Sequence, residues 1–335
     1  MKKDTFSYYI TKYFADYLPN QQGASANTVS SYRDTFVQLM EFLKKRYHLQ
    51  PEKLSYNDFT VQRIEAFLNF LETERKVSVS TRNQRLAAIH AFFRFVQFRD
   101  PAGFAQSSSI MAITYKKAPS KPVSYMSMEE IAFLLTIPDQ RDDRQFRDLT
   151  ILVLLYESGA RVQELIDLTP DSIRFRDIVT VELHGKGSKT RLVPISPDAA
   201  RIVKEYMRRY RCQEGQCPLF VNRQGTKLTR AGIQYIIDKY ISIGKSQRPE
   251  LYQGHISNHS FRHSKAMHLL EAGVNLIYIR DLLGHESVTT TEIYAKANPK
   301  TKEEQLIKYS QSIETVPKYT SKNKEDLISW LKNNF

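Results

Sequence analysis

The stretch from Asn258 to Tyr294 constrains this chain more than any other part of its sequence. Its apolar residues recur at helical spacing, and the pattern pauses at Gly273 and Gly284. The apolar positions are Met267, Leu269, Leu270, Val274, Ile277, Ile279 and Leu282. Helices that are broken at glycines can direct polar side chains from different elements into one cleft. The stretch therefore predicts a helical region with a shared polar site.

Four polar side chains of this stretch form the candidate site, namely His259, Arg262, His285 and Tyr294. An arginine pairs with two non-bridging oxygens of a phosphodiester, and a histidine donates a hydrogen bond or moves a proton. A tyrosine hydroxyl can attack phosphorus and become a covalent phosphotyrosine. The set suits phosphodiester chemistry without a metal ion.

The charge of the chain indicates a polyanionic partner. Its 335 residues carry a formal net charge of +13, and the sequence pI is about 9.5. An excess of Lys and Arg favours nucleic acid before a membrane surface, although a basic solvated surface is an alternative on charge alone. No segment approaches the roughly 20 apolar residues that a membrane span needs.

The two cysteines and the N-terminus indicate a reducing compartment. Cys212 and Cys217 cannot complete a zinc site alone, and nothing else in the sequence indicates oxidation. The first ten residues begin with lysines, but no apolar run follows, so a secretion signal is not expected. We therefore expect a cytoplasmic protein.

Residues 5–99 predict an all-helical bundle. Apolar stripes at helical spacing occur in residues 32–43, 64–71 and 86–96. Ser25 or Asn27 could cap the first of these helices. Aromatic residues at such spacing more often form a core than a surface on which bases stack, so we expect the phenylalanines of these stripes to be buried.

Prolines and serines predict a linker after the bundle. Pro101, Pro119, Pro122 and the run Ser107–Ser109 are expected to break any helix. The predicted organisation is a helical DNA-binding domain at residues 1–107, a linker at residues 108–124 and a second domain at residues 125–335.

Basic residues in the first domain and the linker are candidate DNA contacts. Arg82 and Arg85 open the third helix, where polar and basic side chains suit phosphate contact. Lys116, Lys117 and Lys121 make the linker basic, so that it could lie along a DNA backbone. A plain solvated linker is the alternative interpretation.

The second domain is predicted to open with a helix and to present an arginine at a helix break. Ser127 and Glu130 form a capping box before an apolar run. The apolar stretch 149–156 is long enough for a buried helix, and Arg161 follows its Ser-Gly-Ala end. Glu164 lies one turn after Arg161, where a carboxylate can orient the guanidinium.

Residues 173–195 change to β signals. The segments IVTVELHG and TRLVPI flank GKGSK, which predicts a hairpin with its turn at residues 185–189. Lys186 and Lys189 would lie at the tip of this ribbon, where a lysine could enter a groove and protonate a leaving oxygen. Lys189 and Arg191 are candidate DNA contacts. A lysine in a turn is ordinarily only a solvated charge. A functional role is favoured here only because the other motifs are present.

The last part of the chain, about residues 300–335, is predicted to be a docking tail. Leu327, Ile328, Trp330 and Leu331 recur at helical spacing near its end. Such a short amphipathic helix could dock onto its own domain or onto a neighbouring subunit.

Five motifs occur in one order along the chain. They are Gly-Ala-Arg at 159–161, Gly-Lys-Gly at 185–187, His-x-x-Arg at 259–262, Leu-Gly-His at 283–285, and Tyr294. In this order they resemble the catalytic domain of the tyrosine recombinases, the phage integrase family, and most closely its simple Xer-type and transposon-encoded members. The resemblance covers most of residues 125–300, and the helical N-terminal part is similar to the family's core-binding domain in size and character.

The resemblance implies a fold and a set of partners. The fold would be mainly α with a small antiparallel β-sheet in the catalytic domain, and the two domains would form a C-shaped clamp around DNA. The partners would be double-stranded DNA with paired recombination sites and further copies of the chain, joined into a tetramer through the C-terminal tail. No cofactor and no metal ion are implied.

The resemblance also implies which residues bind the scissile phosphate. Arg161 and Arg262 would clamp it, and His285 would donate a hydrogen bond to it. Glu164 would support this group.

The remaining residues would carry out the chemistry. Tyr294 would be the nucleophile and form a 3′-phosphotyrosine link. Lys186 would be the general acid toward the leaving 5′-oxygen, and His259 fits a general acid or base.

Three functions stay open at this point. They are site-specific recombination, relaxation of DNA in the manner of a type IB topoisomerase, and DNA binding without catalysis. His259 and His263 have the spacing of a zinc pair, but Ser260 stands where a metalloprotease would have Glu, so zinc is not expected. Tyr278 is the nearest rival of Tyr294, and its apolar neighbours favour a packing role instead.

Overall fold

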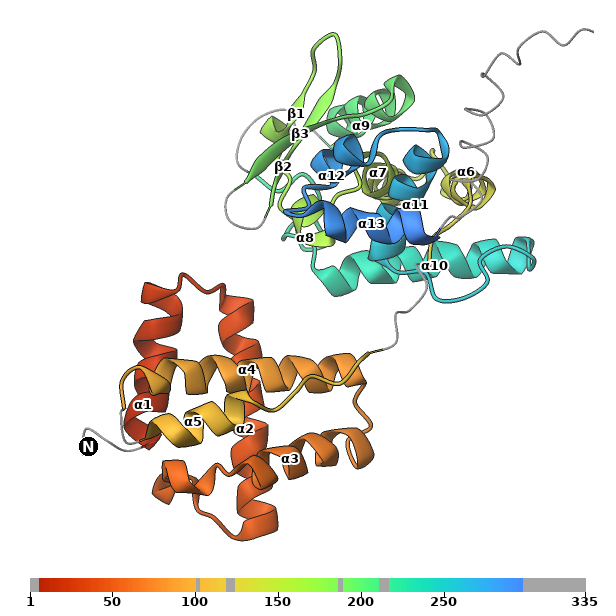
Figure 1. The fold of residues 1–335 in the computed structure, drawn as a ribbon. Helices are drawn as coiled ribbons and strands as arrows, with labels where there is room; N and C mark the ends of the chain where they lie inside the picture. Colours follow the sequence, from red (N-terminus) through yellow and green to blue (C-terminus); the bar gives the residue numbers. More distant parts are fainter. Residues whose placement is uncertain (1–5, 101–102, 119–123, 186–188, 211–216, 298–335) are drawn as a thin grey trace, which may run out of the picture. The chain divides into compact units, whose positions relative to one another are not determined.

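The computed structural model describes residues 6–100, 103–118, 124–185, 189–210 and 217–297 (Figure 1). The chain divides into two compact units, Met1–Lys121 and Pro122–Phe335. Each unit is described by itself below. The predicted docking tail at about residues 300–335 lies outside the described residues.

The described part of the first unit consists of helices joined by loops, without a strand, as the sequence predicts. Its elements are α1 (Phe6–Lys12), the π-helical η1 (Tyr13–Gln21), α2 (Ala26–Tyr47), the 3-10 turns η2 (Pro51–Lys53) and η3 (Tyr56–Asp58), α3 (Val61–Thr73), α4 (Val79–Gln97) and α5 (Phe104–Met111). Side-chain caps set three of the helix starts. Ser25 accepts a hydrogen bond from the backbone of α2, Thr60 from that of α3 and Ser78 from that of α4.

Aromatic side chains form the core of the first unit. Phe36, Phe67, Phe92 and Phe93 are all at most 1% exposed. The ring of Phe92 lies edge-on to those of Phe36 and Phe93, an arrangement that aromatic pairs prefer. The expectation that these stripes form a core is therefore confirmed.

The serine run at residues 107–109 does not break a helix, so that prediction was wrong. Helix α5 runs through it to Met111 and lies beside α4 (Figure 1). The hydroxyl of Ser109 donates to the Ala105 carbonyl one turn earlier, and Ile110 is fully buried. Burial of Ile110 and the packing of α5 on α4 offset the weak helix propensity of serine.

The second unit is mostly helical with one small sheet. Its helices are α6 (Met128–Thr136), α7 (Asp143–Ser158), α8 (Val162–Ile166), α9 (Pro197–Arg209), α10 (Arg230–Gln247), α11 (Asn258–Glu271), α12 (Leu276–Leu283) and α13 (Val288–Ala297), with a 3-10 turn η5 (Pro170–Ser172). The predicted capping box is present, since Ser127 and Glu130 exchange side-chain and backbone hydrogen bonds at the start of α6.

Helix α7 is the central helix of the second unit. From Leu149 to Leu155 each of its residues is at most 4% exposed. It packs against α9 on one side and α11 on another. A helix that is apolar all round is expected to be buried in this way. The position of α7 therefore fixes the position of the residues that follow its C-terminal end.

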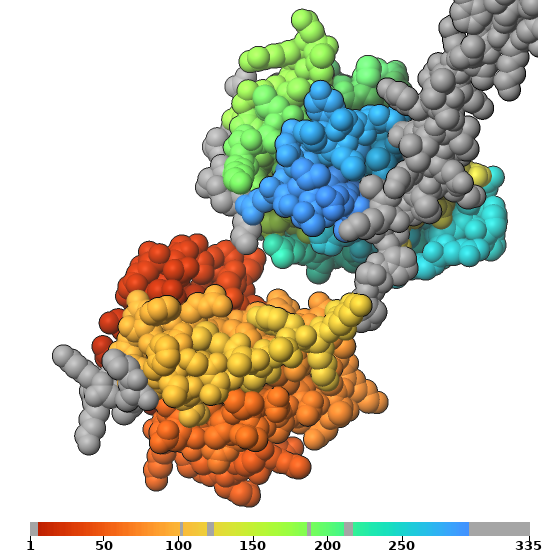
Figure 2. Space-filling model, viewed as in Figure 1, coloured from red at the N-terminus to blue at the C-terminus, as the bar shows by residue number. Residues whose placement is uncertain are grey.

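The sheet has the order β1-β2-β3 and is antiparallel, with β1 (Ile173–Arg174), β2 (Thr180–His184) and β3 (Thr190–Pro194). In the register of β2 and β3, Val181 pairs with Val193 and Leu183 pairs with Arg191. Val181 and Val193 are both buried. The predicted hairpin is thus confirmed up to its turn, and residues 186–188 of the turn lie outside the described residues. On the surface of this unit, Figure 2 shows the green hairpin next to the blue α12 and α13.

Two further features of the described residues bear on the expected class of protein. No described helix is long and apolar enough to cross a membrane. Within the same part of the chain, no group of three or more His, Cys, Asp or Glu side chains is arranged to hold a metal ion.

Candidate active site

The end of α7 turns sharply to deliver Arg161. Gly159 closes the helix in the left-handed conformation with φ of +55°, and a Cβ there would lie 3.0 Å from the Leu283 side chain. Glycine suits this position because it has no Cβ and adopts positive φ readily. The turn places Arg161 immediately before α8, close to the end of α12.

Arg161 is held by an acid and by a backbone carbonyl. Its Nη1 donates to Glu164 Oε1 at 2.7 Å, and its backbone N–H donates to Glu164 Oε2 at 2.8 Å. Its Nη2 donates to the Gly284 carbonyl at 3.1 Å. The side chain stays 36% exposed, so the guanidinium is oriented and still accessible to a ligand.

Glu164 joins Arg161 to Arg191 of β3. Arg191 donates from both terminal nitrogens to the Glu164 carboxylate, at 2.7 and 3.0 Å, and its Nε donates to the Leu282 carbonyl at 2.8 Å. Burial raises the pKa of Glu164, but the hydrogen bonds from Arg191 and Arg161 outweigh it and lower the pKa. These bonds use three of the five N–H groups of Arg191, which therefore holds Glu164 in place. Its predicted DNA contact stays a prediction.

Arg262 is buried where two helix ends meet. It is 4% exposed, and its terminal nitrogens donate to the Gly159 carbonyl at 2.8 Å and the Leu283 carbonyl at 2.6 Å. Burial, with the neighbouring Arg161 and Arg191, lowers its pKa to about 10. The guanidinium is therefore still charged at neutral pH, although little solvent reaches it.

His285 and Tyr294 lie against each other. Their rings are nearly parallel at 11°, with centroids 6.5 Å apart. Nδ1 of His285 lies 2.9 Å from the hydroxyl of the buried Thr291 on α13. Burial and the nearby Arg262 and Arg161 lower the pKa of His285 to about 4, so the imidazole is neutral at pH 7.

The Tyr294 hydroxyl meets a histidine of α11. Tyr294 is 1% exposed, and its oxygen lies 2.9 Å from His263 Nδ1. Burial raises the pKa of Tyr294, while the charge of Arg262 opposes the rise. His259 lies one turn before His263 with ring centroids 6.4 Å apart, and burial together with Arg262 and Arg161 lowers its pKa.

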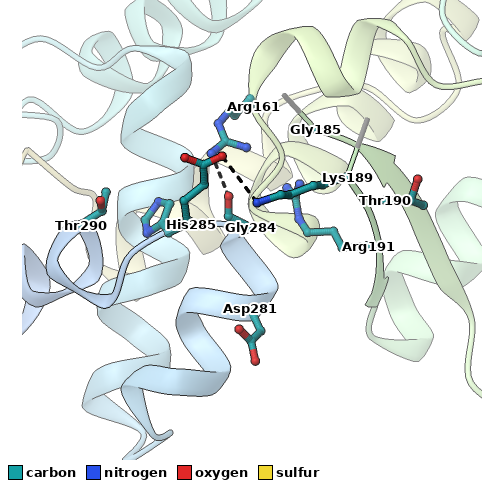
Figure 3. A pocket seen from close by; sticks show the side chains of 10 residues that line it. Arg161, Gly185, Lys189, Thr190, Arg191, Asp281, Gly284, His285 and Thr290 are labelled. Carbon is teal, nitrogen blue, oxygen red and sulfur yellow. Dashed lines mark hydrogen bonds and ion pairs between the residues drawn. The ribbon is translucent and has the colours of Figure 1, made fainter. Parts of the chain in front are cut away.

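A pocket of about 430 Å³ opens beside these groups (Figure 3). Arg161, Lys189, Arg191 and His285 line it together with Gly284, and Asp281 and Glu286 lie at its wall. The lining thus contains three cationic side chains and two acidic ones. This excess of positive charge, with a neutral histidine among the lining residues, suits an anionic group such as a phosphate.

Of the two hairpin lysines, the structure describes Lys189 but not Lys186. Lys186 lies outside the described residues, so the structure does not place the predicted general acid. Lys189 faces the pocket and pairs with Glu286 at 3.5 Å, with both side chains at least 70% exposed. An exposed pair of this kind is weak, so Lys189 remains available to another anion.

The predicted DNA contacts of the first unit are partly internal. Arg82 is 5% exposed and donates to the Thr114 carbonyl at 3.4 Å. Arg85 donates to the Ser31 carbonyl and to the Thr35 hydroxyl, each at 3.0 Å. These guanidiniums join the helices of the bundle, so the structure gives them a packing role that helical spacing alone did not indicate.

The predicted linker lysines are placed differently again. Lys116 pairs with Glu72 of α3, whereas Lys117 is exposed. Lys121 lies outside the described residues. Both described lysines therefore lie at the surface, since the Lys116 side chain is still 48% exposed in its pair with Glu72.

The sequence did not indicate the roles of two residues of the site, and one prediction for a residue outside the site was wrong. His263 and Thr291 hold the Tyr294 hydroxyl and His285, respectively. His263 could have been found, since it lies one turn from His259 on the same helix face. Tyr278 was predicted to be packed, but it is 70% exposed; its apolar neighbour Ile277 is itself 50% exposed.

Two family models match the chain. Residues 124–301 match the model described as the phage integrase family. Residues 11–99 match the model of the phage integrase N-terminal SAM-like domain.

Curated relatives resemble nearly the whole chain. A protein named y4rC from Sinorhizobium fredii, described as an integrase/recombinase, is 35% identical over 302 residues, which cover 90% of each chain. Tyrosine recombinase XerC of Syntrophus aciditrophicus is 31% identical over 85% of this chain and 92% of its own. Tyrosine recombinase XerD of Staphylococcus haemolyticus is 30% identical over 85% and 92%, respectively.

Solved structures share the fold. The XerH site-specific recombinase bound to its palindromic difH substrate aligns with a TM-score of 0.69 at 21% identity, covering 86% of this chain and 82% of that one. The Tn1549 transposon integrase in complex with transposon right-end DNA aligns with a TM-score of 0.68 at 15% identity, covering 89% and 98%. At such identities the likeness concerns the fold alone.

Proposed function

Because the chain belongs to the phage integrase family and is a site-specific recombinase, we propose that it cuts and rejoins DNA strands through a covalent link to Tyr294. The observation that carries this proposal is the convergence of four sequence motifs on one place in the second unit. Arg161 and Arg262 both bond the backbone at the end of α12, where His285 follows and Tyr294 stacks on it.

The arginines bind the scissile phosphate in this proposal. The transferred phosphoryl group carries its charge on non-bridging oxygens, and neutralising that charge is the main catalytic requirement. Arg161 is oriented by Glu164 and partly exposed at the pocket, and Arg262 adds a second fixed positive charge. His285 lines the same pocket and donates a hydrogen bond to the phosphate.

The covalent step exchanges one phosphate ester for another. The Tyr294 oxygen attacks phosphorus, the bond to the 5′-oxygen breaks, and a 3′-phosphotyrosine forms. The leaving oxygen takes a proton from Lys186, with His259 as a further acid or base, which are the roles that the family resemblance assigns to them. Because the phosphotyrosine conserves the energy of the ester bond, a strand from another site can be joined without ATP.

The partner in this proposal is double-stranded DNA that carries paired recombination sites. The net charge of +13 supports a polyanionic partner, and XerH and the Tn1549 integrase are bound to DNA in their structures. A tetramer joined through residues 300–335 completes the proposal and allows strand exchange through a Holliday junction.

A covalent-trapping experiment tests the central claim. Nicked duplexes cut from the DNA that flanks the gene are incubated with the full chain in EDTA, so that the cleaved strand leaves and the covalent complex accumulates. We expect a protein–DNA band for the wild type and none for Tyr294→Phe. Tyr278→Phe is the matched control, since Tyr278 is an exposed tyrosine of the neighbouring helix, and it should trap DNA normally.

Each other outcome points to a different function. A band that persists in Tyr294→Phe moves the nucleophile to another residue. Tight binding without any band favours DNA binding without catalysis. Relaxation of supercoiled plasmid without exchange between two sites favours the topoisomerase-like activity.

A further inference from the structure

The Tyr294–His263 pair is a feature of the site that the roles above leave unused. The two side chains come from different helices, α13 and α11, and their polar atoms lie 2.9 Å apart. Their ring centroids lie 5.7 Å apart with the planes at 59°. The hydroxyl that is to attack phosphorus therefore starts in contact with an imidazole nitrogen.

The surroundings keep this imidazole neutral. His263 is partly buried, Arg262 and His259 adjoin it on its own helix, and burial with these neighbours lowers its pKa to about 4. From the other elements, Tyr294 of α13 and His285 of the turn after α12 face it. A neutral imidazole has one nitrogen that accepts a hydrogen bond, and Nδ1 is that nitrogen when the proton is on Nε2.

We propose that His263 is a further catalytic residue: its Nδ1 accepts the hydrogen bond of the Tyr294 hydroxyl and takes the phenolic proton as the tyrosine attacks. This inference rests on the proposed function, because it assigns the base for the nucleophile named there. Burial raises the pKa of the Tyr294 phenol, so its proton needs an acceptor. His263 Nδ1 is such an acceptor, 2.9 Å from the hydroxyl oxygen.

The step balances in atoms and charge. The bond from the Tyr294 oxygen to phosphorus forms as the bond from phosphorus to the 5′-oxygen breaks. The phenolic proton moves to His263 Nδ1, and the 5′-oxygen receives its proton from the general acid. On rejoining, a 5′-hydroxyl attacks the phosphotyrosine and gives its proton back to the general acid, and the departing Tyr294 oxygen takes the other proton back from His263.

The same helix offers a matched pair for comparison. His268 of α11 has its Nδ1 3.0 Å from the hydroxyl of Tyr156 on α7, and both residues are buried. The geometry of this second histidine–tyrosine pair is nearly the same, but its tyrosine is not the one proposed to attack DNA. Replacement of His268 therefore measures what the loss of such a bond does to the fold.

The test uses the nicked duplex that traps the wild-type enzyme, in two versions. One carries the natural 5′-oxygen at the scissile phosphate, and the other carries sulfur there, a leaving atom that departs without a proton. The full chain with His263→Asn is compared with wild type, Lys186→Ala and His268→Asn for the rate of covalent complex formation from about pH 6 to about pH 9. Binding of the same duplex confirms that each variant is folded, and His263→Gln is a second replacement.

We expect His263→Asn to form the covalent complex about 100-fold more slowly near neutral pH on both substrates. Its rate should rise with pH, since the phenol must then lose its proton to solvent, whereas the wild-type rate on the sulfur substrate should be nearly flat. The sulfur substrate should restore Lys186→Ala but not His263→Asn. His268→Asn should stay within about threefold of the wild-type rate.

Two results would overturn the proposal. One is a wild-type rate in a folded His263 variant, and the other is a slow variant that keeps the flat wild-type pH profile, which would leave His263 only a positioning role. Both are distinct from failure of the proposed function, in which Tyr294→Phe still becomes linked to DNA or the wild type never does.

Discussion

At the scale of single residues, the arginines of the site are held by carbonyls at helix ends. Arg262 donates to Gly159 and Leu283, and Arg161 donates to Gly284. The last carbonyls of a helix have no partner within it and carry partial negative charge, so they fix the Arg262 guanidinium without neutralising it, whereas Arg161 is also held by Glu164. The remaining N–H groups of each guanidinium can then bind a phosphate.

This arrangement predicts a large effect for Arg262→Lys. An ammonium group cannot reach two carbonyls in different directions and present a further flat pair of donors. We expect the rate of covalent complex formation to fall about 100-fold or more, as for loss of one preorganised donor. The nicked-duplex assay measures it, with Arg248→Lys, a surface arginine paired with Glu129, as the control. Equal rates for the two variants would contradict this role of Arg262.

At the scale of elements, Arg191 fastens the β-sheet to the helices that carry the site. It joins β3 to Glu164 of α8 and to the last turn of α12, and its side chain is only 13% exposed. Gly284 allows this approach, because a Cβ there would lie 3.0 Å from the Arg191 guanidinium. The sheet therefore holds Glu164, and through it Arg161, in place.

Replacing Arg191 with methionine should destabilise the second unit strongly. The change removes one of the two arginines that bond the buried Glu164 carboxylate and leaves Arg161 as its partner, so we expect a loss of about 1.5–3 kcal/mol. Arg174→Met in the same sheet breaks a more exposed pair with Glu182, for which we expect at most about 1 kcal/mol. Urea unfolding of the full chain compares the two free energies of unfolding. A loss no larger for Arg191→Met than for Arg174→Met would show that Arg191 does not fasten the sheet.

At the scale of the whole molecule, the neutral histidines make stability depend on pH. Burial lowers the pKa of His263 and of His285 to about 4, whereas a histidine in an unfolded chain has a pKa near 6.5. Between these values the unfolded chain binds more protons than the folded one. The contribution of these two histidines to the free energy of unfolding should therefore be complete above about pH 6.5. It should decrease as the pH falls toward 4.

The replacement of both histidines by asparagine should reduce this dependence. Calorimetry of the full chain between about pH 7 and about pH 5 should show a smaller loss of melting temperature for the variant with His263→Asn and His285→Asn than for wild type. His255→Asn is the control, because His255 is exposed, and it should follow the wild type. A double variant that loses as much stability as the wild type would assign the acid sensitivity to other groups.

Most of the helices, the hairpin and the motifs of the site could be predicted from local patterns in the sequence. Periodicity and caps are local properties, so Ser25, the capping box at Ser127 and the hairpin that leads to Lys189 could all be predicted. The order of the motifs indicated that Arg161, Arg262, His285 and Tyr294 act together, and the described structure brings these four residues to one place.

Which side chains meet across elements depends on how the elements pack and could not be predicted from local patterns. The contacts of His263 with Tyr294 and of Arg191 with Glu164 join segments far apart in the sequence, and local periodicity gives a residue's face but not its neighbour. Burial of Arg82 and the continuation of α5 through residues 107–109 have the same cause. Packing against other helices there outweighs the local preference of arginine for the surface and of serine for a turn.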